Sequence, residues 1–255
     1  TLYKKNEGDK NNIRIPAIVI APDGTVLAFA GSCTLLRTSN DRGATWSPVK
    51  EIVPGENLNG NVMVDETNGE IIILSPSGEE PFIHRSKDNG RTWKKELITI
   101  RPNAMQQGVW GNAPINIGAM EPGITLKYGD HRGRLLIAGR IQPPKGDNAQ
   151  EYWMYNYNTS VYSDDHGKTW QVSDPIMTGT GEGALAELSD GRVYYNSRSH
   201  MSVDHKRRIA WSHDGGNRWV DWSVSEDLFE IGEPFYFKYG TKPSYGCKAG
   251  LVRVP

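Results

Sequence analysis

Short runs of apolar residues, each followed by a turn and then by a second apolar run, recur along the chain. The first pair covers residues 17–20 and 25–29, and the turn between them contains Pro22-Asp23-Gly24. Three further pairs have the same form, at residues 62–64 with 70–74, 124–126 with 134–138, and 184–188 with 192–195. Runs of this length separated by Gly, Asp and Asn residues predict β-hairpins. Because no segment shows a sustained helical period, the pattern predicts an all-β protein.

An eight-residue motif, Ser-x-Asp-x-Gly-x-x-Trp, lies between these hairpins, and we call it the box. It occurs at residues 39–46, 86–93, 163–170 and 212–219. Ser and Asp side chains can hydrogen-bond nearby backbone amides and hold a turn closed, and Gly supplies the positive φ that such a turn needs. The Trp begins the next strand and can bury a large apolar surface between neighbouring sheets. Four intact copies indicate a repeat protein.

The spacing of the boxes predicts the architecture. Their first residues are Ser39, Ser86, Ser163 and Ser212, which lie 47, 77 and 49 residues apart. Periods of about 40–50 residues are typical of β-propellers, in which each blade is a four-stranded antiparallel sheet. The long middle interval fits either one blade with elaborated loops or an additional blade whose turn has lost the pattern.

The length of the chain predicts an open ring. At about 45–50 residues per blade, 255 residues supply about five blades. Residues 245–255 have the pattern of a strand that has just begun. We therefore expect residues 1–255 to form a single propeller domain that is incomplete at its C-terminus.

Composition narrows the range of partners and cofactors. The formal net charge is −1, which gives no reason to expect nucleic acid or an anionic membrane as partner. No apolar run approaches the ~18 residues of a membrane span, and residues 1–6 lack the apolar core of a signal peptide. A cytoplasmic location and export with a removed leader both stay open, and we favour the second. The six histidines show no metal-ligand spacing, so we expect no metal and no cofactor.

The two cysteines, Cys33 and Cys247, lie far apart in the sequence. A disulfide framework would need more cysteines in a smaller domain, so we expect two separate buried thiols.

Three charged residues lie where predicted strands begin or end. Arg14 precedes the first apolar run, and Arg198 follows the run at residues 193–195. Two arginines that converge on one end of a propeller could bind a carboxylate through bidentate hydrogen bonds. Glu182 lies at the other end of the same predicted hairpin as Arg198. Taken singly, each arginine also fits a surface position at a strand end, and Glu182 also fits a solvated loop.

These residues and the boxes together resemble the sialidase (neuraminidase) family of six-bladed β-propellers. The resemblance begins with Arg-Ile-Pro at residues 14–16, ahead of the first strand, and with the repeated boxes. It extends to residues 181–198, which are similar to the family segment that holds its catalytic glutamate and second arginine. Residues 59–65 and 246–252 also resemble family segments. The resemblance covers nearly the whole chain and implies a six-bladed propeller.

The resemblance also implies a function and three site residues. The family contains exo-α-sialidases, which are glycoside hydrolases that release terminal α-linked sialic acids from sialylated glycans. Arg14 and Arg198 would belong to an arginine triad that binds the sialic acid carboxylate, and Glu182 would be catalytic by polarising a tyrosine nucleophile. A tyrosine takes the place of the usual carboxylate nucleophile, which the carboxylate of the substrate would repel. An aspartic acid would serve as general acid and base, and the tyrosine and third arginine are expected beyond residue 255.

One part of the family pattern is missing from this sequence. The family's acid/base aspartate lies between the first hairpin and the first box, but residues 30–38 contain no carboxylate. The nearest ones, Asp23 and Asp41, belong to a hairpin turn and to a box. Three functions therefore stay open: an exo-α-sialidase, a catalytically inactive lectin-like propeller that binds sialic acid, and a structural propeller that shares the boxes. The matched glutamate and arginines argue against the third, because the boxes alone do not require them, and we prefer the first as the parent activity.

Further motifs carry alternatives of their own. Four aromatic residues of the long middle interval, Tyr152, Trp153, Tyr155 and Tyr157, fit either strand packing or a wall against a sugar ring. The triplet at residues 158–160, Asn-Thr-Ser, matches the N-glycosylation pattern. His84 and His213 flank boxes, and we expect both on the surface.

Overall fold

The structure is a computed structural model built mainly of β-strands. It describes residues 2–4, 13–76, 80–107, 115–142, 155–200, 204–230 and 247–253, together with the backbone of residues 235–236 and 243–244. The strands form four sheets of four or more strands and one two-stranded ribbon, and α1 (Ala104–Gln107) is a single helical turn. The predicted all-β class is confirmed. Among the described residues no helical segment has the length and hydropathy of a membrane span.

The first two sheets are four-stranded and antiparallel, and their strands follow one another in sequence order. The first sheet contains β1 (Ala17–Ile20), β2 (Val26–Ala30), β3 (Leu35–Ser39) and β4 (Lys50–Glu51). The second contains β5 (Asn61–Asp65), β6 (Glu70–Ser75), β7 (Phe82–Ser86) and β8 (Lys94–Leu97). The pairs β1–β2 and β5–β6 are the first two predicted hairpins, and in each sheet a box connects the third strand to the fourth.

The third sheet accounts for the long interval between the second and third boxes. Its strands are β9 (Thr99–Arg101), β10 (Ile115–Asn116), β11 (Ile124–Thr125), β12 (Leu135–Ile141), β13 (Tyr157–Ser163) and β14 (Thr169–Val172). β9 pairs in parallel with β14 at the edge, and β10 and β11 both pair with β12. The described residues of this interval therefore form one elaborated blade rather than two.

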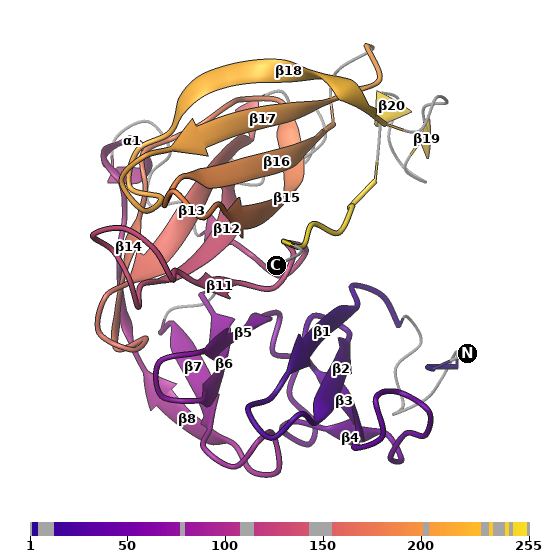
Figure 1. Cartoon of the computed structure of the whole chain (residues 1–255). Coiled ribbons are helices and arrows are strands. Elements are labelled where there is room, and N and C mark those ends of the chain that lie inside the picture. Colours follow the sequence, from indigo (N-terminus) through magenta and orange to yellow (C-terminus); the bar gives the residue numbers. More distant parts are fainter. Residues whose placement is uncertain are drawn as a thin grey trace.

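The fourth sheet returns to the simple four-stranded order. It contains β15 (Thr180–Glu187), β16 (Val193–Ser199), β17 (Lys206–Ser212) and β18 (Val220–Phe229), and β19 (Phe235–Tyr236) pairs with β20 (Pro243–Ser244) beyond it. Inner strands of successive sheets are in contact. β1 contacts β5, β5 contacts β11 and β12, and β12 contacts β15. Figure 1 shows the sheets following one another in an arc, with the C-terminal segment in yellow between the first and fourth sheets. This is the arrangement of propeller blades.

All four boxes close with the same kind of hydrogen bonds. In the third box, Ser163 Oγ accepts from Gly167 N at 2.9 Å and donates to Asp165 Oδ1 at 2.8 Å. Asp165 Oδ1 also accepts from Thr169 N at 2.9 Å. The glycines of the four boxes have φ between 81° and 91°. The predicted roles of Ser, Asp and Gly in the box are confirmed.

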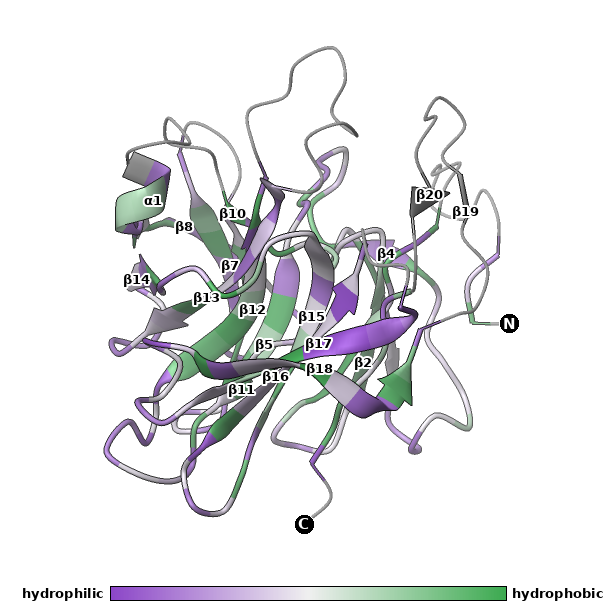
Figure 2. Ribbon diagram, turned by 90° about the horizontal axis from the view of Figure 1, so that it is seen from above, coloured by the Kyte–Doolittle hydropathy of each residue, from purple (hydrophilic) through white to green (hydrophobic). Residues whose placement is uncertain are grey.

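The box glycines also let neighbouring blades approach closely. A Cβ placed on the glycine of the second box would lie 2.2 Å from Leu27 of the preceding sheet. The corresponding distances are 3.1 Å to Ile72 for the third box and 2.6 Å to Leu136 for the fourth. Gly43 of the first box meets Trp46 of its own box, and among the described residues no preceding blade covers it. In Figure 2, apolar residues in green run along inner strands such as β12.

Two expectations about single residues are wrong. His84 lies in β7 and is 2% exposed, because this strand runs in the middle of its sheet and both of its faces are covered. Cys247 is exposed, whereas Cys33 is buried as expected, and neither cysteine forms a disulfide. His213 is exposed, as expected.

Candidate functional site

Glu182 and Arg198, which belong to opposite ends of one hairpin in the sequence, lie side by side in the fourth sheet. Antiparallel pairing brings the start of β15 to the end of β16, with Gly183 opposite Ser197. The register shifts between Thr180 and Gly183, so the strand is irregular where Glu182 lies, and such irregularities re-aim side chains. Arg198 Nη1 donates to both carboxylate oxygens of Glu182, at 2.8 and 3.1 Å.

His200 contacts the same carboxylate. Its Nε2 lies 3.2 Å from Glu182 Oε2, and the ring is buried. A Cβ on Gly181 would lie 2.3 Å from that nitrogen, so the ring fits here because residue 181 has no side chain. Burial lowers the pKa of His200 to about 4, although Glu182 opposes this effect. The imidazole is therefore uncharged near neutral pH.

Glu182 is ionised in this setting. Burial alone would raise its pKa, but the hydrogen bond from His200 and the charges of Arg198 and Arg140 outweigh burial. The pKa of Glu182 is therefore held below its usual range. An ionised carboxylate at a strand end can accept a hydrogen bond from a hydroxyl group brought to it.

A third arginine, Arg140, belongs to the same cluster and was not selected from the sequence. It is the penultimate residue of β12 in the preceding blade, and its charge interacts with those of Glu182 and Arg198. Its Nε and Nη1 atoms are buried and have no hydrogen-bond partner. The sequence contained a signal for it, since Arg140 follows the apolar run at residues 135–138 much as Arg198 follows its own strand.

Arg14 precedes β1 of the first sheet, whereas the cluster belongs to the third and fourth sheets. Arg14 is exposed, and in the described part of the chain no hydrogen bond or ion pair connects it with Glu182 or Arg198. Its loop is nevertheless joined to their hairpin. Lys248 Nζ donates to the carbonyl oxygen of Pro16 at 3.1 Å and pairs with Glu121, whose N–H donates to the carbonyl of the residue after Glu182 at 3.1 Å.

The connection between β2 and β3 contains no carboxylate that could act as an acid. It is a short turn at residues 31–34. Asp23 lies in the β1–β2 turn, at the opposite end of β1 from Arg14, and pairs with Arg91 at 3.3 Å. Asp41 is held by the hydrogen bonds of the first box. Both of these carboxylates have structural partners away from the cluster.

Comparison with known proteins identifies the family. Residues 73–227 match the family model of the BNR repeat-like domain. The sialidase of Micromonospora viridifaciens is 31% identical over 261 residues, which cover 85% of this chain and 37% of that protein. The sialidase of Paraclostridium sordellii is 24% identical and covers 100% of this chain and 66% of that protein. The chain belongs to the sialidase family of BNR-repeat β-propellers.

The fold of this sialidase-family chain agrees with solved structures. The intramolecular trans-sialidase from Ruminococcus gnavus superposes with a TM-score of 0.67 at 13% identity, covering 91% of this chain and 74% of that one. Likeness at this identity establishes the propeller fold that the sequence predicted. The chain spans 37% and 66% of the length of the two sialidases named above.

The hydroxyl group of Tyr195 interacts electrostatically with Arg140, which makes Tyr195 a candidate nucleophile in this sialidase-family chain. Its surroundings make it unsuited to that role. Its hydroxyl donates to the carbonyl of Gly139 at 3.1 Å, and the side chain is fully buried. Burial raises its pKa far above the usual value. The ring packs edge-to-face on Trp219 of the fourth box, with centroids 5.1 Å apart. Tyr195 is therefore a packing residue.

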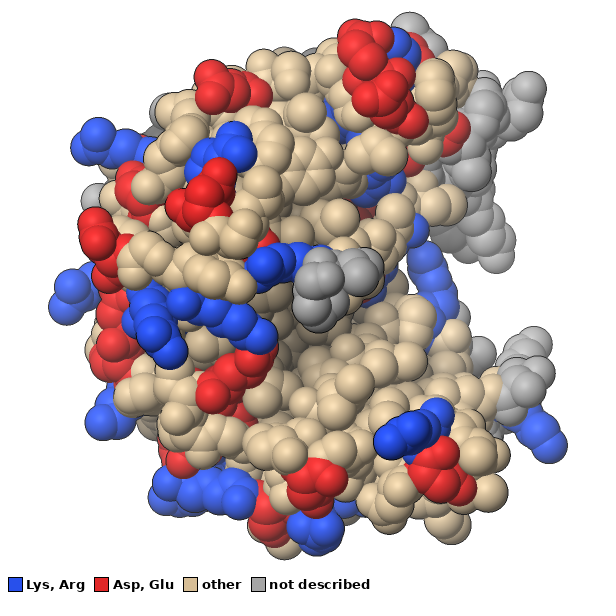
Figure 3. All heavy atoms as spheres, in the orientation of Figure 1, with Lys and Arg blue, Asp and Glu red and all other residues tan. Residues whose placement is uncertain are grey.

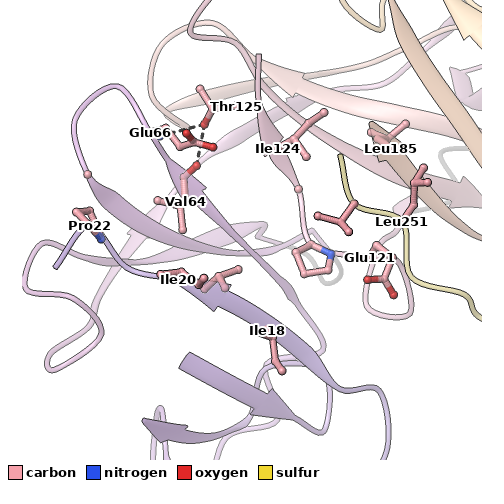
Figure 4. Close-up of a pocket in the computed structure, with 15 residues that line it drawn as sticks. Ile18, Ile20, Pro22, Val64, Glu66, Glu121, Ile124, Thr125, Leu185 and Leu251 are labelled. Carbon is pink, nitrogen blue, oxygen red and sulfur yellow. Dashed lines mark hydrogen bonds between the residues drawn. The ribbon is translucent and has the colours of Figure 1, made fainter. Parts of the chain in front are cut away.

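A cavity of about 740 Å³ lies along the inner strands of the sialidase-family propeller. Figure 3 shows the molecule hollowed between its two halves, and Figure 4 shows largely apolar side chains around the cavity. They come from β1, β5, β11 and β15, from loops beside these strands and from the C-terminal segment, and include Ile18, Ile20, Ile124, Leu185 and Leu251. The cluster of Glu182 and the two arginines does not line this cavity, so it is a separate site.

The aromatic residues of the middle interval do not form one wall among the described residues. Tyr152 and Trp153 lie outside the described residues. Tyr155 is exposed, whereas Tyr157 is buried in β13 and its hydroxyl donates to Asn103 Oδ1 at 3.3 Å. For Tyr157 the structure supports the alternative of strand packing.

Asn158, the first residue of the predicted glycosylation triplet, is a structural residue. It is fully buried in β13. Its Nδ2 donates to the carbonyl of Gly181 at 2.9 Å, and its Oδ1 accepts from Ser197 Oγ at 2.6 Å. A glycan on this side chain would require the strand to leave the sheet.

Proposed function

We propose that this protein is an exo-α-sialidase that hydrolyses terminal α-linked sialic acids of glycoproteins, glycolipids or oligosaccharides. The observation that carries the proposal is the ion pair of Glu182 and Arg198, two residues that by resemblance correspond to the family's catalytic glutamate and second arginine. A planar guanidinium suits the carboxylate of sialic acid. Membership of the sialidase family supports the choice of substrate.

The proposal gives each residue a chemical role. Arg14 and Arg198 bind the carboxylate attached to the anomeric carbon, and this carboxylate disfavours attack by an anionic nucleophile. A tyrosine from beyond residue 255, polarised by Glu182, attacks instead, and the reaction retains the anomeric configuration. The ionised state of Glu182 supports this role, because the carboxylate must accept the phenolic proton.

Binding of sialic acid without hydrolysis is a second candidate, and one observation favours it. The β2–β3 turn is too short to present the acid/base aspartate of the family, and Asp23 and Asp41 have other partners. Loss of a general acid typically costs about 10²–10⁴-fold in rate. The same arginines would then serve a lectin-like propeller.

Turnover of a fluorogenic sialoside distinguishes the two functions. We expect the 255-residue chain alone to be inactive and a protein that continues into the remaining blades to hydrolyse the substrate. In that longer protein, Glu182→Gln should lower kcat by about 100-fold or more, whereas Glu226→Gln, at an exposed glutamate paired with Lys206, should leave kcat unchanged.

The outcomes separate the candidates as follows. Binding of sialyllactose without turnover by the longer protein supports the lectin-like function. Turnover by the 255-residue chain itself contradicts the assignment of the nucleophile to a later blade. Unchanged affinity in Arg14→Ala removes Arg14 from the carboxylate site.

A further inference from the structure

Two nitrogen atoms of the Arg140 guanidinium, Nε and Nη1, are buried without the hydrogen-bond partners that such a group usually has. Both atoms are inaccessible to water. Arginine is seldom buried unless it is paired, because a buried charge without hydrogen bonds is costly. An unsatisfied buried donor beside a candidate site therefore calls for an explanation. A ligand that accepts hydrogen bonds from these donors is one such explanation.

Among the residues that the structure describes, the charges acting on Arg140 leave an excess of one positive charge. Arg140 and Arg198 are cations, and Glu182 is the anion that pairs with Arg198. The neighbouring buried pair of Arg207 and Glu230, 3.3 Å apart, is neutral as a unit. Burial lowers the pKa of His200 to about 4, so the histidine beside Glu182 adds no charge near neutral pH. A ligand with a single negative charge would balance this cluster, whereas a second negative charge would be repelled by Glu182.

Contacts between blades hold Arg140 in position. β12 packs against β15, and Tyr195 on β16 donates to the carbonyl of Gly139, the residue before Arg140. Asn158 on β13 donates to the carbonyl of Gly181 and accepts from Ser197 Oγ, which fixes both strands of the Glu182 hairpin. The strand that carries Arg140 is therefore fixed against the Glu182 hairpin, and groups on a preorganised scaffold bind ligands with a smaller cost of ordering.

We propose that Arg140 binds the carboxylate of the ligand together with Arg198, so that arginines from two adjacent blades hold one monocarboxylate. The family resemblance does not assign this role to Arg140. The identity of the ligand as sialic acid rests on the proposed function. The unpartnered N–H groups of Arg140 supply the donors, while Glu182 continues to hold Arg198. Charge-assisted hydrogen bonds of this kind are among the strong ones in proteins.

Binding measured by calorimetry with two related ligands tests the proposal. One ligand is the α-methyl glycoside of N-acetylneuraminic acid, and the other is its uncharged methyl ester. Arg140→Met keeps an unbranched apolar stem and removes the guanidinium with its charge, and Arg132→Met, at an exposed arginine, is the matched control. We expect Arg140→Met to raise the Kd for the acid about 10- to 100-fold, to leave the weak binding of the ester unchanged, and not to lower the Tm of the unliganded protein. Arg132→Met should change none of the three.

The other possible results would each contradict one of the two proposals. Equal weakening of acid and ester, or a lower Tm of unliganded Arg140→Met with unchanged Kd, would mean that Arg140 is structural. A different result would be that acetate raises the Tm of the wild type more than chloride does, with no such effect in Arg140→Met and no binding of the glycoside to either protein. That result would keep the carboxylate site but refute the sialidase proposal. Tight binding of the acid by both wild type and Arg140→Met would keep the proposed function and refute the role of Arg140.

Discussion

Acidification from pH 7 to pH 5 should destabilise this protein through His200. Burial lowers the pKa of this histidine to about 4 in the folded protein, from an ordinary value of 6.5. As the pH falls through 6.5 the unfolded chain takes up a proton at this position, and the folded protein takes it up only near pH 4. The unfolded state therefore binds more protons in this window, so stability decreases as the pH falls.

The size of the effect follows from the two pKa values. Each unit of difference corresponds to about 1.4 kcal/mol, so the full shift is worth about 3 kcal/mol, and about 2 kcal/mol of it is lost between pH 7 and pH 5. Glu182 acts in the same direction but at lower pH. Its pKa is below the usual value of 4.5, so the stability it contributes is present above pH 4.5 and is lost as the pH falls further. Above pH 5 the slope from this cluster therefore belongs to His200.

Urea unfolding followed by tryptophan fluorescence at pH 7, 6 and 5 measures this slope. His200→Gln keeps a hydrogen-bond donor but cannot titrate, so its free energy of unfolding should fall by about 2 kcal/mol less than that of the wild type over the same range. His213→Gln is the control, because His213 is exposed and lies outside the Glu182 cluster, so its substitution should leave the slope of the wild type unchanged. If the difference in stability between wild type and His200→Gln is the same at all three pH values, the inferred burial of an uncharged His200 is wrong.

Two further predictions concern the scaffold. Gly216→Ala would place a Cβ 2.6 Å from Leu136 at a φ of 86°, so we expect a loss of about 2–4 kcal/mol in urea unfolding from overpacking and backbone strain. Gly24→Ala has a similar φ of 84° with no atom within 4 Å of the new Cβ, and should lose about 1 kcal/mol; equal losses would contradict the close packing of the box against the preceding blade. In the native protein a thiol reagent should modify Cys247, which is exposed, and spare Cys33, which is buried and whose pKa burial raises, until the chain is unfolded; rapid reaction of both would contradict the burial of Cys33.

The predictable part of this fold is the part that local sequence encodes. A turn of Asp and Gly between two apolar runs specifies a hairpin, and Ser, Asp and Gly of each box close a turn whose hydrogen bonds join residues at most four positions apart. The parallel pairing of β9 with β14 joins residues about 70 positions apart and depends on how the third sheet closes. For that reason the sequence left the long interval open between two architectures.

The same distinction applies to the candidate site. Glu182 and Arg198 could be selected because they belong to one hairpin, where antiparallel pairing makes their meeting a local event. Arg140 joins them from another blade, and its strand-end position looks like that of many surface arginines. His84 was misplaced for a related reason, since a polar residue in a short strand is expected outside unless the neighbouring blades are known to cover it.

Arg140 also resolves a difficulty in how this site could hold a ligand. Both oxygens of Glu182 accept from Nη1 of Arg198, so a carboxylate that approached Arg198 alone would compete with an ion pair that is already formed. Breaking that pair would leave Glu182 buried with less compensation, which is costly. Arg140 offers buried donors that no side chain occupies, and an anion bound there would gain hydrogen bonds without displacing Glu182. The ligand carboxylate and the glutamate can then be present together, which a mechanism that uses Glu182 while the substrate is bound requires.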